Sequence, residues 1–342
     1  MDIGERLSSA ADSAPAAAPA PATAPATGPG PASAPAPAPG PAAAPGPAPA
    51  ENPVAGPLLI AAAPNGAYKT RADHPAIPLT AAQLAEAAAA VLDAGARMLH
   101  LHVRDRAGRH TLDAAAYRAA IAAIRARVGG ELFLQCTSEA AGVYDAAAQR
   151  RAVDALIGAD GAGVDGVDGI SLAVRELAGN DADARAAAPL FGRLHARGIL
   201  AQYIVYSAAD IAEYHALRAR GIIPAGRHSV LLVAGKREPD AIETSALDKL
   251  RRMVDALPAE TPWMACAFGA HEFACLTEAA RLGGHARIGF ENSLVLRDGR
   301  RAADNRQLIE QFTVAGNPLH RPLAAEFRQA KVALGGDGDG DG

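Results

Sequence analysis

Short apolar segments alternate with longer, alanine-rich segments eight times between residues 58 and 314. The apolar segments have the length and the bounding turn residues of buried β-strands, and the longer segments have the residue spacing of helices. Repeated strand–helix units fold with a mostly parallel sheet. The repeat therefore restricts the fold to a closed (β/α)8 TIM barrel or an open, doubly wound sheet.

The number of units favours the barrel. Eight strand–helix units match the pattern of a (β/α)8 barrel, which typically has about 250 residues. A doubly wound sheet would instead carry a Gly-x-Gly-x-x-Gly turn after its first strand. The first apolar segment is followed by Pro64-Asn65-Gly66-Ala67, which lacks this pattern. We therefore predict an α/β fold of the (β/α)8 TIM-barrel type.

The predicted strands and helices alternate along the chain. Thr80 and Gln83 have the spacing of a capping box, which predicts the start of the first helix. The predicted strands are 58–63, 98–103, 132–137, 169–174, 199–206, 229–234, 263–268 and 287–290. The predicted helices are 80–95, 113–128, 146–157, 181–197, 209–220, 245–257, 271–282 and 304–314.

Both ends of the chain differ from the barrel-like part. Residues 1–56 are mainly Ala, Pro and Gly, a composition that favours a disordered, extended tail. The last residues alternate Gly and Asp but lack the Glu that closes a calcium-binding loop, so 332–342 is predicted to be a second disordered tail. The predicted catalytic domain is 57–331.

Charge and cysteine content point to a cytoplasmic protein without a nucleic-acid or membrane partner. The formal net charge is −4, and the pI is about 6.2, so no basic surface for a polyanion is indicated. No apolar run is long enough to cross a bilayer. The three cysteines, Cys136, Cys266 and Cys275, have no metal-type spacing, and we predict that they are reduced.

A His-x-His pair ends the second predicted strand. Side chains alternate along a strand, so His100 and His102 point to one face and Leu99, Leu101 and Val103 to the other. Neutral imidazole is a preferred ligand of zinc and similar metals. The pair therefore indicates a metal site. The alternative is a pair of core histidines that bond to backbone carbonyls.

A matching carboxylate lies at the end of the eighth predicted strand. Arg287, Gly289 and Glu291 share one face by alternation. Strands eight, one and two become neighbours when a barrel closes, so Glu291 can approach the two histidines. Two histidines and one carboxylate with open positions suit catalytic zinc, with iron or manganese as alternatives. The alternative places Glu291 in a surface turn or in an ion pair with Arg287.

Polar residues also follow other predicted strands, at the end where the active sites of such barrels lie. Two of them, Lys236 and Arg237, form a cationic pair on a loop that could hold phosphates. The full set of polar residues on or after these strands is Asn65, Thr137, Ser138, Glu139, Gln202, Tyr206, Ser207, Lys236, Arg237, His271 and Glu272.

Four motifs together resemble one family. They are APNG (63–66), HLHVRD (100–105), GGHARIGFEN (283–292) and DGRRAADN (298–305). Their order and spacing are similar to those of the β-keto acid cleavage enzymes over residues 58–327. The resemblance implies a zinc-dependent barrel, usually a homotetramer. It also implies the conversion of a β-keto acid and acetyl-CoA into acetoacetate and a new acyl-CoA.

The resemblance assigns roles to individual residues. His100, His102 and Glu291 look like the metal ligands. Arg287 looks like the catalytic arginine, and Thr137 or Ser138 lies where the family holds the substrate carboxylate. The remaining positions that we assign to the pocket are Asn65, Tyr68 and Gln202 for substrate binding and Asn292 for catalysis.

The chain departs from the family pattern at three places. Asn292 stands where the family prototype has Asp, so the general base is predicted to differ, with Glu139 and Glu272 as candidates. Tyr68 stands where the prototype has Glu. The fifth strand reads Ala201-Gln202-Tyr203-Ile204 where the family often has two carboxylates. Loss of these charges predicts a substrate with a neutral or anionic side chain.

Two other functions stay open at this point. One is a metal-dependent barrel hydrolase, a type that also uses His-x-His but carries it on strand one. The other is a non-catalytic protein that binds a metal or an acyl-CoA, which the Asn292 substitution motivates. Turnover of β-keto acids with acetyl-CoA distinguishes these alternatives from the cleavage enzyme.

Overall fold

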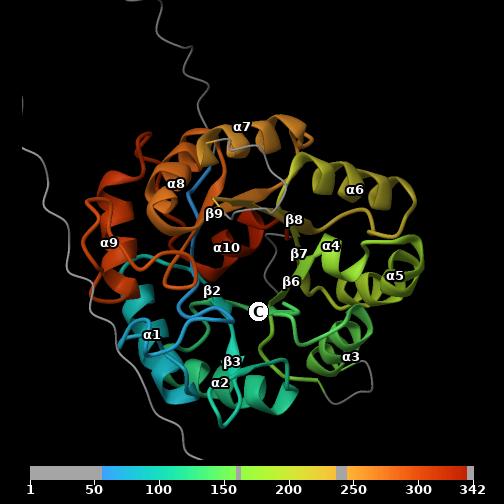
Figure 1. The fold of residues 1–342 in the computed structure, drawn as a ribbon, viewed down its shortest axis with the longest axis horizontal. Coiled ribbons are helices and arrows are strands. Elements are labelled where there is room, and N and C mark those ends of the chain that lie inside the picture. Colours follow the sequence, from blue (N-terminus) through green and yellow to red (C-terminus); the bar gives the residue numbers. More distant parts are fainter. Residues whose placement is uncertain (1–55, 159–162, 236–244, 337–342) are drawn as a thin grey trace, which may run out of the picture. The chain divides into compact units, whose positions relative to one another are not determined.

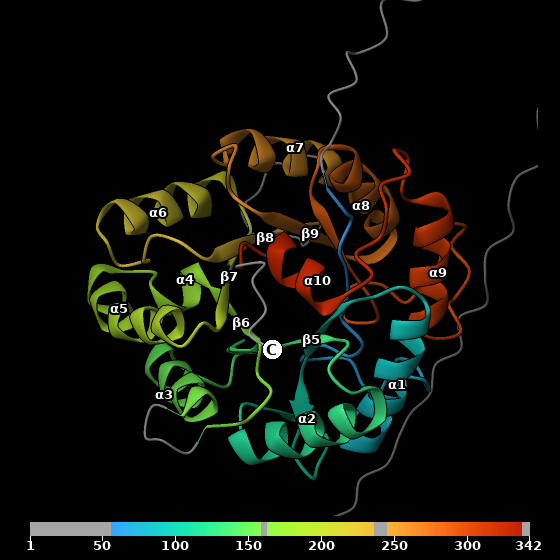
Figure 2. The same ribbon diagram turned by 180° about the vertical axis from the view of Figure 1, so that it is seen from behind.

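The computed structural model describes residues 56–158, 163–235 and 245–336. Within these residues, parallel strands close into a barrel in the order β1-β10-β9-β8-β7-β6-β5-β2, and helices surround it (Figures 1 and 2). The predicted (β/α)8 TIM barrel is confirmed, and the open sheet is excluded. The barrel strands are β1 (Ile60–Ala62), β2 (Met98–Leu101), β5 (Phe133–Thr137), β6 (Gly169–Ala173), β7 (Leu200–Val205), β8 (His228–Ala234), β9 (Trp263–Ala267) and β10 (His285–Ile288).

Each outer helix follows a strand, and all of them except α8 (Glu272–Arg281) begin at a side chain that caps the helix. The Thr80 hydroxyl accepts from the backbone N–H of Gln83, and the predicted capping box is present. The helices are α1 (Ala81–Asp93), α2 (Ala114–Val128), α3 (Ala146–Ile157), α5 (Asp181–Ala196), α6 (Ala208–Ala219), α7 (Ala246–Ala256), α8 (Glu272–Arg281) and α9 (Asn305–Ala315).

The closure of the barrel brings together segments that are far apart in the sequence. Ile60 of β1 pairs with Ala286 of β10, and Ala61 pairs with Met98 of β2. The residues after β10 therefore lie beside those after β1 and β2. This is the arrangement that the candidate metal site requires.

Alternation along the strands produces two apolar layers. Leu99 and Leu101 of β2 belong to the layer between the strands and the helices, whereas Met98 belongs to the layer inside the barrel. Polar residues interrupt the inner layer in its middle: Gln135, Ser171, Gln202 and Ser229, all of them buried. The interior of the barrel thus becomes polar beneath the C-terminal ends of β2, β5 and β7.

Two of the predicted strands differ from the observed ones in ways that bear on the candidate site. The segment expected to be one strand, 98–103, is divided into β2 and β3 (Val103–Arg104), because β3 pairs with β4 (His110–Thr111) in an antiparallel ribbon. The eighth strand, expected at 287–290, ends two residues earlier. Gly289 has a φ of +148° and leaves the strand conformation.

Two helices were not predicted. Helix α4 (Val174–Leu177) directly follows β6, and α10 (Phe327–Ala333) lies across the N-terminal end of the barrel (Figure 2). Phe327 stacks on Phe133 at the start of β5, with ring centroids 5.9 Å apart. The predicted boundary at residue 331 falls inside α10. Nearly all of the predicted N-terminal tail (1–55) and residues 337–342 lie outside the described residues.

The described residues also bear on membranes and disulfides. None of the helices in these ranges has the length and apolar character needed to cross a bilayer. Cys136, Cys266 and Cys275 are free and buried. Their burial agrees with a place in the core, and their reduced state stays a prediction.

Candidate active site

Three potential metal ligands meet at the C-terminal end of the barrel. His100 lies on β2, His102 follows it, and Glu291 lies three residues beyond the end of β10. The Nε2 atoms of the two histidines are 3.0 Å apart. Glu291 Oε2 lies 3.4 Å from His100 Nε2 and 3.5 Å from His102 Nε2. One ligand atom from each residue lies within 4.8 Å of the others, so the three side chains can share one ion.

The chemistry of these groups fits a divalent metal. Burial lowers the pKa of His100 to about 3, although Glu291 opposes the shift. The imidazole is therefore neutral at pH 7. Burial by itself would raise the pKa of Glu291. The nearby Arg287, His100 and His102 outweigh this effect and hold the pKa of the carboxyl well below its usual range. Glu291 Oε2 is buried without a hydrogen-bond partner among the described residues. Two imidazoles and a carboxylate form the donor set of many catalytic zinc sites.

A chain of amide groups holds His100 from below. Gln135 Oε1 lies 2.7 Å from His100 Nδ1, and because an amide oxygen can only accept, Nδ1 carries the proton. The Nε2 lone pair of His100 then faces the other two ligands. Gln135 Nε2 donates to Gln202 Oε1 over 3.1 Å, and Gln202 Nε2 donates to Ser229 Oγ over 3.2 Å. Such partners fix the orientation of metal-binding histidines.

Asn65 holds the second histidine through its backbone. Asn65 Nδ2 donates to the carbonyl oxygens of His102 and Pro78, over 3.0 Å in each case. Asn65 is fully buried. Its side chain therefore joins the loop after β1 to the end of β2.

Arg287 is the cation of the site. Its Nη2 donates to Glu291 Oε1 over 3.0 Å and to Cys266 Sγ over 3.3 Å. Its Nε is buried without a partner in the described ranges. One edge of the guanidinium thus orients the carboxylate, and further N–H groups remain for a bound anion.

A cavity opens above these groups. It is lined by His100, Thr137, Ser138, Glu139, Ala173, Ile204, Tyr206, Val233, Phe268, Arg287 and Glu291. Thr137 Oγ1 accepts from the backbone N–H of Glu139 over 3.0 Å, and Ser138 Oγ donates to the carbonyl of Ser171 over 2.8 Å. Both hydroxyl groups are therefore held in place at the cavity wall.

Several predicted residues do not line this cavity. Gln202 lies below it in the amide chain, and Asn65 acts on the backbone of His102. Tyr68 is 66 % exposed. Asn292 is buried, and neither polar atom of its side chain has a partner among the described residues. The cavity lining thus includes the predicted ligands His100 and Glu291, Arg287 and the two hydroxyl residues. It includes neither these four residues nor the third predicted ligand, His102.

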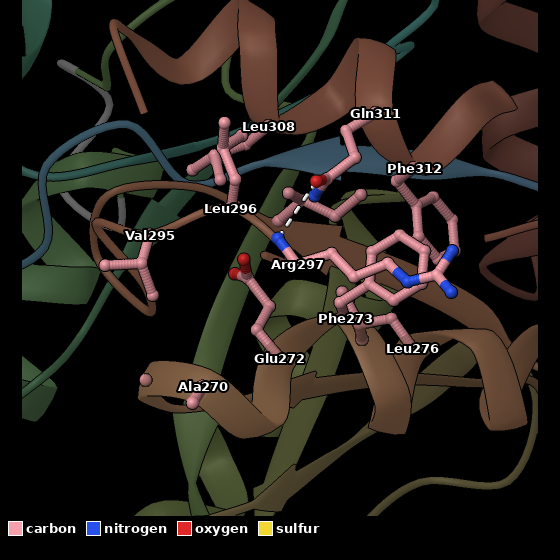
Figure 3. Close-up of a pocket in the computed structure, with 12 residues that line it drawn as sticks. Ala270, Glu272, Phe273, Leu276, Val295, Leu296, Arg297, Leu308, Gln311 and Phe312 are labelled. Carbon is pink, nitrogen blue, oxygen red and sulfur yellow. Dashed lines mark hydrogen bonds between the residues drawn. The ribbon is translucent and has the colours of Figure 1, made fainter. Parts of the chain in front are cut away.

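The two candidate bases lie in different places. Glu139 lines the cavity, and its Oε2 is 3.7 Å from His102 Nε2. Glu272 instead lines a separate, narrow cleft between α8 and α9 (Figure 3). Glu272 Oε1 accepts from the N–H of Gly289 over 3.2 Å, and burial raises its pKa well above its usual range. Of the two, only Glu139 faces the candidate site.

The sequence interpretation missed residues that hold the loop after β1. Arg104 donates to the carbonyl oxygens of Gly66, Ala67 and Lys69. Lys69 Nζ donates to the carbonyl of Glu291 over 2.5 Å. A Cβ on Gly66 would lie 2.5 Å from Glu291 Cγ, so this loop needs glycine there. The HLHVRD motif already contained Arg104, but its partners are backbone atoms that a sequence does not reveal.

Gln135 was also missed, although the sequence held a signal for it. It alternates with Thr137 on the third predicted strand, and the register pairs it with His100. A polar residue at an inward position of an apolar strand is a candidate support for a site on the neighbouring strand. Lys236 and Arg237 lie outside the described residues.

Comparisons with known proteins agree with this geometry. Residues 57–335 match the model of the family described as beta-keto acid cleavage enzyme. The chain is 28 % identical to the 3-keto-5-aminohexanoate cleavage enzyme of Fusobacterium nucleatum, over 80 % of this chain and 96 % of that protein. It is 23 % identical to the 3-oxoadipate:acetyl-CoA acetyltransferase of Cupriavidus necator, over 82 % of this chain and 95 % of that protein.

The fold resembles solved structures as well. A ternary complex of ObcA with a C4-CoA adduct and oxalate superposes with a TM-score of 0.58 at 17 % identity. The match covers 76 % of this chain and 68 % of that chain. At this identity the similarity concerns the fold.

Proposed function

The chain belongs to the beta-keto acid cleavage enzyme family, and from this premise we propose that it converts a β-keto acid and acetyl-CoA into acetoacetate and a new acyl-CoA. It is then an acyltransferase that breaks a carbon–carbon bond. The observation that carries the proposal is the cavity in which His100, Glu291 and Arg287 converge with two fixed hydroxyl groups. The names of the relatives support the β-keto acid and acetyl-CoA as substrates.

We propose zinc as the metal, held by His100, His102 and Glu291. The support is the donor set and the unpartnered Glu291 oxygen. When bound, zinc would supply Lewis-acid polarisation of the keto group. The homotetramer stays a prediction from the resemblance, and the cytoplasmic location stays a prediction from the charge and cysteine content.

The balance of atoms determines which bonds form and break. C2 of the β-keto acid loses a proton and forms a bond to the acetyl carbon of acetyl-CoA, which releases the CoA thiolate. The thiolate then forms a thioester with the former keto carbon. The bond between that carbon and C2 breaks, and C2 takes up a proton as part of acetoacetate.

The side chains of the cavity suit these steps. Negative charge develops on C2 and on the carbonyl oxygens, and the guanidinium of Arg287 is a fixed cation in a buried site. Fixed charges and donors of this kind stabilise developing anions strongly, because they need no reorganisation. Thr137 and Ser138 both line the cavity, and we assign the binding of the substrate carboxylate to one of these two hydroxyl groups.

The proposal is tested by turnover and metal content together. Purified protein, with about one zinc per chain, is assayed for acyl-CoA formation from a panel of β-keto acids with acetyl-CoA. His100→Ala should lose the metal by elemental analysis. Arg287→Ala should keep it and lower kcat by about a hundredfold or more.

Arg109→Ala, at the exposed β3–β4 ribbon, is the control and should match the wild type in both measurements. Absence of turnover with every β-keto acid by the zinc-loaded protein would contradict the proposal and favour a binding protein. Wild-type turnover by Arg287→Ala would contradict the role of the arginine.

A further inference from the structure

The wall of the cavity changes its chemical character around the barrel. The charged lining residues and the small polar ones come from β10, β2 and β5 or the loops after them, and β1, which lies between β10 and β2, contributes none. The lining residues from the other four strands, β6 to β9, are Ala173, Ile204, Tyr206, Val233 and Phe268. The cavity therefore has a polar half and an apolar half.

The apolar half continues the core of the barrel. Ala173, Ile204 and Val233 point inward and belong to the inner apolar layer, where each is at most 8 % exposed. Tyr206 and Phe268 pack against the same layer. Arg175 of α4 lies over the Tyr206 ring, with its guanidinium carbon 4.1 Å from the ring centre. The same guanidinium pairs with Asp210. The aromatic part of the wall is thus held in position.

The charged groups of the described lining are confined to the polar half. Arg287 and Glu291 pair with each other, and Glu139 lies near His102. Among the described residues, no charged side chain lines the apolar half. A charged substituent placed there would lose its hydration without gaining a partner, whereas an alkyl group would gain apolar contacts.

On the basis of the proposed function, we propose that the apolar half binds the substituent of the β-keto acid. The keto acid end lies against the polar half, where the metal ligands, Arg287 and the hydroxyl groups are. The substrate class is then short β-keto acids with an uncharged aliphatic substituent. This narrows the sequence prediction, which allowed an anionic side chain as well.

Three β-keto acids with the same six-carbon chain test the proposal directly. They are 3-oxohexanoate, which has a neutral end, 3-oxoadipate, which has an anionic end, and 3-oxo-5-aminohexanoate, which has a cationic substituent. The kcat/KM of the zinc-loaded wild type with acetyl-CoA should be highest for 3-oxohexanoate, by at least about tenfold. A higher kcat/KM for either charged compound would overturn the proposal.

A variant with a carboxylate in the apolar half provides a second test of the proposed substrate class. Ile204→Glu should lose activity toward 3-oxohexanoate and gain relative activity toward 3-oxo-5-aminohexanoate, while its zinc content stays at the wild-type level. Ile204→Val is the matched control and should keep the wild-type order. If Ile204→Glu does not fold, the wild-type panel still decides the proposal.

A binding measurement separates this inference from the proposed function. Each compound is added without acetyl-CoA, and the shift in melting temperature is recorded. Preferential stabilisation by 3-oxohexanoate without turnover would support the apolar subsite and contradict the proposed reaction. Turnover that favours a charged compound would support the reaction and contradict the subsite.

Discussion

Gln135 shows how one residue outside the cavity lining determines the state of a candidate ligand. Its Oε1 accepts from His100 Nδ1, and its amide nitrogen is in turn held by Gln202. Both interactions are buried, so the imidazole of His100 has one tautomer and one orientation. The arrangement leaves the Nε2 lone pair toward His102 and Glu291.

At this scale we predict that Gln135→Leu weakens zinc binding by about 10- to 100-fold, because the loss of such a partner frees the ring and leaves Nδ1–H unpaired. Competition with a chromophoric chelator measures the affinity. Gln149→Leu, a buried glutamine of α3 that bonds to Glu176, is the matched control. Equal zinc affinity in Gln135→Leu and wild type would show that the amide chain does not support the ligand.

The segment after β10 is the element that carries Glu291 into the site. Gly289 makes this possible, since a Cβ there would lie 2.3 Å from the carbonyl oxygen of Ala63. Asn305, at the start of α9, ties the same region together. It accepts from the N–H of Phe290 over 2.8 Å and donates to the carbonyl of Pro64 over 3.1 Å. The loops after β1 and β10 therefore act as one unit.

We predict that Gly289→Ala lowers the free energy of unfolding by about 2–3 kcal/mol, at the upper end for a single substitution. It should also lower zinc affinity, because Glu291 is displaced. Denaturant unfolding and metal analysis check both effects. Gly192→Ala in α5 meets nothing within 4 Å and should instead add about 0.5–1 kcal/mol. If Gly289→Ala leaves the free energy of unfolding unchanged, the two loops can separate without loss of stability.

The whole molecule contains histidines that are neutral because the fold buries them. Burial lowers the pKa of His285 to about 3, and Arg321 adds to the effect. His285 Nδ1 accepts from the N–H of Leu59 over 3.1 Å. Burial also lowers the pKa of His228 to about 4, and its Nε2 lies 2.6 Å from the hydroxyl of Tyr214. Protonation of these rings is compatible only with a changed or unfolded structure.

The sign of the pH dependence follows from these shifts. Each folded pKa lies below the unfolded value of about 6.5, so the unfolded chain binds protons first as the pH falls. The stability from the neutral rings is complete above about pH 6.5 and is lost progressively toward pH 4. We predict that the melting temperature falls continuously between these limits.

His285→Asn keeps an acceptor for Leu59 but cannot titrate in this range. Its free energy of unfolding should depend less steeply on pH, by up to about 1.4 kcal/mol per pH unit. Identical slopes for wild type and His285→Asn would contradict the assignment of acid sensitivity to this ring.

The sequence by itself determined the fold class and the face on which the ligands lie. Strand and helix periods are local properties, and so are helix caps such as Thr80 and Gln83. Eight repeats of the two periods were therefore enough to predict the barrel. Alternation placed His100 and His102 on one face, and barrel closure brought Glu291 toward them.

Only the tertiary structure decided how the site is held and what its cavity can accept. The bond from Gln135 to Gln202 joins residues 67 positions apart, and no local period reveals it. The end of β10 depends on the approach of Gly289 to Ala63, a contact across the closed barrel. The apolar half is formed by inward side chains of four neighbouring strands, and these side chains line one cavity only in the folded barrel. Contacts of this kind depend on packing between distant segments, whereas the repeat depends on each segment alone.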